Sequence, residues 1–167
     1  QLLTDAVKGM VSSLDPHSSY LDKKDFLLTV VGDGIQREEL ESKADIENTS
    51  FLGFRKDISE LLSQHHVLIM PSLREGLPLT LIEATCNQLP VIASHVGGIP
   101  NLVEDNKNGI LIRSESTEEL VRAIIGMKNN FPSFKHEAQR LAPIYRERFS
   151  DTTWAQKTIE IYKLFNQ

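Results

Sequence analysis

Two glutamates, Glu75 and Glu83, flank a largely apolar run, residues 77–82. This run follows a strand-like apolar segment and has the composition of a core helix, in which an unused carboxylate is costly. Gly76 allows close backbone approach just before the helix, and the free N–H groups of a first helical turn attract anions. The segment therefore predicts a pocket with amides for a phosphate and carboxylates for hydroxyl groups.

The chemistry of the two glutamates suits a sugar. A carboxylate that accepts hydrogen bonds from two adjacent hydroxyls fits the diol of a sugar or ribose. Glu83 is expected to point back toward the helix start, on the face that carries Leu79 and Thr80. On spacing alone, however, a helix-capping Glu75 and a solvated Glu83 are the better explanation, because this spacing is common by chance.

The elements around this segment alternate between short strands and helices. Most strand candidates are continuous apolar runs, which is typical of strands buried on both faces of a parallel sheet. They are residues 27–31, 49–51, 67–70, 91–93 and 109–112. The predicted fold class is therefore α/β, a Rossmann-like doubly wound parallel sheet with right-handed crossovers, and its ligands are expected at the carboxyl ends of the strands.

Start signals mark the predicted helices. Asp57 followed by Glu60 predicts a capping box that opens a helix at residues 58–63. Ser116 precedes an amphipathic helix, and Pro78 suits the first helical position after Gly76. Two further amphipathic helices, at residues 134–149 and 152–165, end the chain.

A series of short motifs occurs in order along the same region. They are Val30-Val31-Gly32-Asp33-Gly34, Phe51-Leu52-Gly53-Phe54, Met70-Pro71-Ser72, Glu75-Gly76-Leu77-Pro78-Leu79 with Glu83-Ala84, Val96-Gly97-Gly98-Ile99-Pro100, and Asn108-Gly109. The series closely resembles the C-terminal, donor-binding domain of glycosyltransferase family four, which has the GT-B fold. The resemblance covers residues 27–167. One departure is Asn101, where the family commonly has Glu.

The resemblance implies a nucleotide diphosphate sugar as donor, transfer with retention of anomeric configuration, and a role in polysaccharide biosynthesis, with no metal or other cofactor. Glu75 takes the catalytic position, at donor-sugar hydroxyls near the anomeric carbon. Glu83 would hold the ribose hydroxyls. The other donor-binding residues expected are Gly32 at the phosphate end, Gly53, Phe54 and Arg55 beside the base, and Gly76, Leu77, Pro78, Leu79 and Thr80 along the sugar and diphosphate.

Two parts of the family pattern are missing. The donor domain normally begins with a strand and a Gly-rich loop whose Arg and Lys neutralise the diphosphate, and the acceptor-binding N-terminal domain precedes it. Without those cations the leaving-group charge is poorly stabilised, which is usually a large catalytic term. We therefore expect the donor-binding half of a retaining glycosyltransferase, inactive alone, so that whether this chain is itself an enzyme stays open.

Loss of the first strand has a structural consequence. That strand normally lies inside the sheet, so its absence would leave unpaired strand edges. The alternatives for its position are residues 18–21, a partner chain or a rearranged sheet. Self-association through an unpaired edge is one expected outcome.

The first 26 residues differ from the rest. An apolar helical stripe runs through residues 3–14 and ends at Asp15-Pro16. Residues 9–22, with Asp25 and Phe26, resemble the N-terminal segment of carboxy-terminal processing proteases, a stretch that holds no catalytic residue of that family. We therefore predict a foreign helix and turn at residues 1–26, joined to a nucleotide-sugar-binding domain at residues 27–167. A chimera or an engineered fusion is favoured over a natural rearrangement.

Composition narrows the function classes. The net charge of -5 offers no basic excess for nucleic acid or an anionic membrane, and no apolar run approaches the ~20 residues of a membrane span. Cys86 is the single cysteine, so no internal disulfide forms and a cytoplasmic location is the default. Two alternatives to a transferase half remain: a folded chimeric module with at most weak nucleotide binding, and a sugar-nucleotide epimerase, which shares the GT-B architecture.

Overall fold

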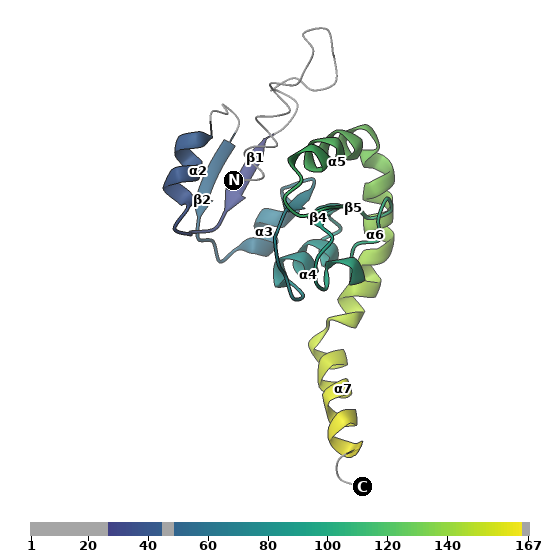
Figure 1. Ribbon diagram of the computed structural model, residues 1–167. Helices are drawn as coiled ribbons and strands as arrows, with labels where there is room; N and C mark the ends of the chain where they lie inside the picture. Colours follow the sequence, from purple (N-terminus) through teal and green to yellow (C-terminus); the bar gives the residue numbers. More distant parts are fainter. Residues whose placement is uncertain (1–26, 45–48, 165–167) are drawn as a thin grey trace.

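The computed structural model describes residues 27–44 and 49–164 of the chain. Over these residues short parallel strands alternate with helices (Figure 1), so the predicted α/β class is confirmed. The elements are β1 (Leu28–Val31), α2 (Arg37–Lys43), β2 (Thr49–Gly53), α3 (Ile58–Ser63), β3 (Leu68–Met70), α4 (Leu79–Cys86), β4 (Val91–Ser94), the 3-10 helix η2 (Ile99–Asn101), β5 (Gly109–Ile112), α5 (Thr117–Asn129), α6 (Phe131–Arg148) and α7 (Asp151–Leu164). The helix expected within residues 1–26 lies outside the described residues.

The described strands form two parallel sheets instead of one continuous sheet. β1 pairs with β2 from Leu28 opposite Thr49, and β3, β4 and β5 form the second sheet in that order. Parallel neighbours need a crossover, and helices supply it here. The sheet is interrupted between β1 and β3, because neither strand has a second partner among the described strands.

The core of the larger sheet lies on both faces of β4, which is buried throughout. Val91 and Ala93 contact the cluster that α4 and α6 contribute, including Leu81 and Leu141. Ile92 points the other way and joins the α5 cluster. Because successive side chains of β4 enter core layers on opposite faces of the sheet, residues 91–93 are all apolar. Fully burying a side chain such as Ile92 contributes about 1.5–3 kcal/mol.

The segment between β4 and β5 is held by buried polar groups. Asn108 Nδ2 donates to the Leu102 carbonyl at 2.9 Å, and Asn108 Oδ1 accepts from the Glu104 amide at 2.7 Å. Tyr145 Oη, on α6, donates to the same Leu102 carbonyl at 2.8 Å. Burial is the main cause that raises the pKa of Tyr145, which keeps this phenol a donor. These bonds fix the chain that leaves the Gly97-Gly98 turn.

Helix starts agree only partly with expectation. Ser116 caps α5, since its Oγ accepts from the Glu119 amide at 3.3 Å. The capping box at Asp57 is wrong: its carboxylate makes no cap and instead accepts from Arg55, with Nε at 2.7 Å. Pro78 occupies the N-cap position, one residue before α4 begins, and not the first helical position. The two helices expected at the end of the chain are present as α6 and α7.

Candidate functional site

The loop that carries Glu75 follows β3 at its carboxyl end and leads into α4. Ser72 Oγ donates to Glu75 Oε1 at 2.7 Å, which orients this half-buried carboxylate. The Gly98 amide donates to the Gly76 carbonyl at 2.6 Å. Gly97 has a φ of +53°, and a Cβ there would lie 1.8 Å from the Glu75 carbonyl oxygen. The Gly97-Gly98 turn is therefore a close-packed support for the Glu75 loop.

Glu83 lies in the second turn of α4. It is half-buried, and its carboxylate has no hydrogen bond or ion pair within residues 27–44 and 49–164. The first turn of α4 has no side-chain cap, because its N-cap residue is Pro78. Uncapped amides and a carboxylate without a partner thus occur on one short helix. This combination could receive a phosphate and hydroxyl groups.

The expectation that residues 77–82 form a core helix throughout is wrong. Leu81 is fully buried, but Leu77 is 42% exposed and Leu79 is 75% exposed. Only the face of α4 that carries Leu81, Ala84 and Thr85 packs into the core. Leu77, before the helix, and Leu79, its first residue, keep exposed apolar surface and are available for contact with a ligand.

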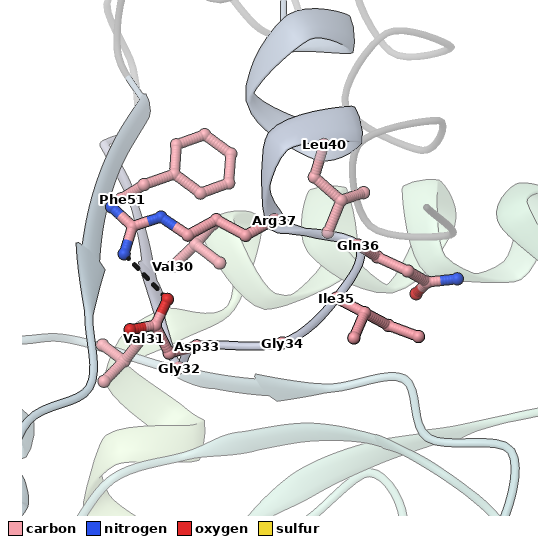
Figure 2. A pocket seen from close by; sticks show the side chains of 10 residues that line it. All are labelled: Val30, Val31, Gly32, Asp33, Gly34, Ile35, Gln36, Arg37, Leu40 and Phe51. Carbon is pink, nitrogen blue, oxygen red and sulfur yellow. Dashed lines mark hydrogen bonds and ion pairs between the residues drawn. The ribbon is translucent and has the colours of Figure 1, made fainter.

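A second group of predicted site residues lies on the smaller sheet. The Gly32 amide donates to the Gly53 carbonyl at 2.9 Å, so the loops after β1 and β2 are adjacent. Gly53 has a φ of +65° and lies against the Arg37 guanidinium, 2.5 Å from where a Cβ would stand. Gly32 borders a cavity of about 530 Å³ at the start of α2 (Figure 2).

The charges around this cavity are already paired. Figure 2 shows the Arg37 side chain turned toward Asp33, and its guanidinium lies 3.0 Å from that carboxylate and 2.8 Å from Glu41. The hydrogen bond to Glu41, and then that to Asp33, raises the pKa of Arg37. Arg55 is engaged in the same way by Asp57, and its hydrogen bond is the main cause that lowers the pKa of Asp57. Phe54 is 69% exposed.

The predicted site residues therefore fall into two groups. The α4 group comprises Glu75, Gly76, Leu77, Pro78, Leu79, Thr80 and Glu83. The β1–β2 group comprises Gly32, Gly53, Phe54 and Arg55. Among the described residues, no side-chain hydrogen bond or ion pair joins one group to the other. Ser72, Gly97 and Gly98 lie within the sequence motifs, but only the fold shows that they contact the Glu75 loop.

The parallel strands, the connecting helices and the glycine-rich loops at strand ends define a Rossmann-like α/β protein. The chain belongs to the family described as glycosyl transferases group 1, whose model matches residues 2–130. That range includes residues 2–26, so the match gives no support for a separate, protease-like origin of this segment. The GT-B fold class predicted from the sequence is confirmed by the comparison with solved structures.

Known proteins are similar over limited parts of their length. An uncharacterized glycosyltransferase of Haemophilus influenzae is 35% identical over 111 residues, which is 64% of this chain and 31% of that protein. An Escherichia coli UDP-Gal:alpha-D-GlcNAc-diphosphoundecaprenol alpha-1,3-galactosyltransferase is 31% identical over 106 residues, 60% of this chain and 27% of that protein. The matches thus span less than a third of each of these relatives.

The structural comparison covers more of the chain. HepE of Anabaena, solved in complex with UDP-glucose, matches with a TM-score of 0.80 and 26% identity over 97% of this chain and 44% of its own. Within the part of the chain that the structure describes, no helix has the length and apolar content to cross a bilayer.

Proposed function

We propose that this chain is the donor-binding half of a retaining glycosyltransferase that uses a nucleotide diphosphate sugar. The observation that carries the proposal is the α4 group. A close-packed glycine turn holds the Glu75 loop beside a helix whose first turn is uncapped and whose Glu83 carboxylate has no partner among the described residues. HepE, which is similar over most of this chain, was solved with a UDP-sugar, which supports the same ligand class here.

Each predicted residue has a role in this proposal. Glu75, oriented by Ser72, contacts hydroxyls of the donor sugar and is the proposed catalytic residue. Residues 76–80 line the sugar and diphosphate, with the amides at the start of α4 facing the phosphates. Glu83 accepts hydrogen bonds from the ribose diol, and charge-assisted bonds of this kind are worth about 1.5–3 kcal/mol each.

The β1–β2 group completes the donor site in the proposal. Gly32 lies at the phosphate end, and Gly53, Phe54 and Arg55 lie beside the base, where the exposed Phe54 ring offers a stacking face. Arg37 and Arg55 are each paired with carboxylates, which offsets part of the positive charge that a leaving diphosphate would need. This supports the further proposal that the chain binds the donor but does not transfer the sugar by itself. We also propose that donor binding needs no metal or other cofactor.

The donor-binding domain is residues 27–167, residues 1–26 are a separate segment with a protease-like origin, and the protein works in the cytoplasm. The alternative function is a folded chimeric module with at most weak nucleotide affinity. A sugar-nucleotide epimerase is less well supported, and formation of an epimer without an acceptor would favour it.

Calorimetric titration with UDP, GDP and their sugars tests the proposal. Binding by one nucleotide series is expected, and Glu83→Gln should weaken it about 10- to 100-fold, the equivalent of one lost hydrogen bond to a charged group. The matched control is Glu160→Gln on α7, an element that lies away from α4 (Figure 1) and should leave affinity unchanged. Absence of binding by every nucleotide would contradict a donor site in this chain.

A further inference from the structure

The short helix α3 connects the two groups of predicted site residues (Figure 1). Near its start, Ser59 Oγ accepts from Asn87 Nδ2, at the end of α4, at 3.3 Å. Just after its end, His65 Nε2 lies 2.8 Å from Thr29 Oγ1 on β1. Side chains at the two ends of α3 therefore reach both α4 and the smaller sheet.

Apolar packing also holds α3 against α4. Leu62 of α3 is buried in one cluster with Ala84 of α4, and Ile58 packs against this cluster. Ala84 directly follows Glu83 and precedes Asn87 by three residues. Both contacts between α4 and α3 therefore lie within about one helical turn of Glu83.

Asn87 contacts Glu83 as well as α3. Its Nδ2 donates to the Glu83 carbonyl at 2.9 Å, and its backbone amide donates to the same carbonyl at 2.9 Å. Residues four apart lie on one face of a helix, so Glu83 and Asn87 share the face that meets α3. One side chain thereby joins the backbone of Glu83 to the first turn of α3.

The loop of the β1–β2 group ends at the same turn of α3. Arg55 is four residues before Ser59, and its guanidinium is engaged by Asp57, immediately before α3. The other end of the loop is held at Gly53, whose carbonyl accepts from the Gly32 amide at 2.9 Å. The loop is therefore attached at both ends, and its separation from α4 depends on where α3 lies.

We propose that Asn87 is a positioning residue that acts through Ser59 to set the separation between residues 53–55 and Glu83. Asn87 has this role only if residues 53–55 lie beside the base and Glu83 holds the ribose, so the inference rests on the proposed function. A base and its ribose are one covalent unit, so the groups that bind them must stand at a matching separation. Holding these groups in place before the ligand arrives strengthens binding, because less freedom is lost on association.

Calorimetric titration of the full chain with UDP and GDP tests this role. Asn87→Ala and Ser59→Ala should each weaken the nucleotide that binds about three- to tenfold, which corresponds to one lost hydrogen bond. Because both substitutions break the same bridge, the double variant should bind no more weakly than Asn87→Ala alone. Ser59→Thr keeps a hydroxyl and should retain the affinity.

Two matched controls separate positioning from stability. Asn130 ends α5 as Asn87 ends α4, and its Nδ2 donates to the Gly126 carbonyl at 3.2 Å, so Asn130→Ala removes the equivalent bond elsewhere. Ser63→Ala removes another hydroxyl of α3, which donates to the Glu60 carbonyl at 2.6 Å. Both controls should leave nucleotide affinity unchanged. Denaturant titration without nucleotide shows that each variant is folded.

Three results would overturn the inference. If Glu83→Gln weakens binding but Asn87→Ala and Ser59→Ala do not, the proposed function stands and the role of Asn87 is wrong. If Asn87→Ala weakens binding and Ser59→Ala does not, the bridge to α3 has no effect. If the unchanged protein binds neither nucleotide, the proposed function fails as well. Should Asn87→Ala not fold, the comparison of Ser59→Ala with Ser59→Thr, at an exposed position, still decides the question.

Discussion

The backbone of Gly97 lies against the carbonyl group of Glu75, so closely that a Cβ at position 97 would stand 1.8 Å from the carbonyl oxygen. The next residue, Gly98, donates its amide to the Gly76 carbonyl at 2.6 Å. The turn after β4 thereby holds the loop after β3, and with it the proposed catalytic carboxylate. The geometry of the α4 group depends on two residues that carry no side chain.

Gly97→Ala is expected to destabilise the protein and to displace the Glu75 loop. The substitution adds strain at a φ of +53° to the clash with backbone, so we expect a loss of about 1–3 kcal/mol in the free energy of unfolding, measured by denaturant titration. Gly34→Ala is the control, since no atom lies within 4 Å of its added Cβ and it should change stability by less than about 0.5 kcal/mol. Equal effects of the two substitutions would contradict the packing described.

Two serines should respond oppositely to the loss of a hydroxyl. Ser94 is fully buried, and its Oγ has no hydrogen-bond partner among the described residues, so Ser94→Ala should leave the free energy of unfolding unchanged or raise it. Ser116 caps α5, and Ser116→Ala should lower that free energy by about 0.5–2 kcal/mol. Thermal or denaturant unfolding of both variants measures the difference. A large loss for Ser94→Ala would show that its hydroxyl has a partner.

A hydrogen bond between β1 and the end of α3 should stabilise the smaller sheet. His65 Nδ1 lies 2.6 Å from the Leu61 carbonyl, which can only accept, so in the neutral ring Nε2 accepts from Thr29 Oγ1 at 2.8 Å. Thr29→Val removes this donor and should cost about 1 kcal/mol of stability, with faster amide exchange in β1. Thr152→Val, on the exposed start of α7, should cost less than the Thr29 substitution. An unchanged β1 exchange rate would contradict a role for this bond.

Acid should weaken the attachment of α5. The Arg113 amide donates to Glu119 at 2.7 Å and is the main cause that lowers the pKa of Glu119 from its ordinary value of 4.5, with the Arg113 guanidinium adding to it. A lowered folded-state pKa means that the stabilisation is complete above pH 4.5 and is lost as pH falls through the folded pKa. The stability difference between the protein and Glu119→Gln should therefore shrink below that pH. A difference that stays constant with pH would contradict this assignment.

Much of the fold could be predicted because its signals are local. Most of the strands are continuous apolar runs, and the structure places all five predicted strands within a residue or two of their expected ends. The capping box failed because Arg55, two residues before Asp57, competes for its carboxylate.

The tertiary contacts that hold the Glu75 loop could not be predicted in the same way. Gly97-Gly98 reads as a turn in the sequence, and its contact with Glu75 depends on how the loops after β3 and β4 meet across the sheet. Leu79 reads as a core residue because its neighbours are apolar, but only the packing of α4 shows that its side chain faces outward. Site residues could be proposed from the ordered motifs, and their roles stay predictions.

The most direct test of the central claim compares UDP with a UDP-sugar on two variants. If Glu83 holds the ribose, Glu83→Gln should weaken both ligands by a similar factor of about 10 or more. If Glu75 holds the sugar, Glu75→Gln should weaken the UDP-sugar and leave UDP unchanged. Calorimetry of the four pairs of ligand and variant measures both differences. Loss of UDP affinity in Glu75→Gln, or unchanged affinity for both ligands in Glu83→Gln, would contradict the proposed site.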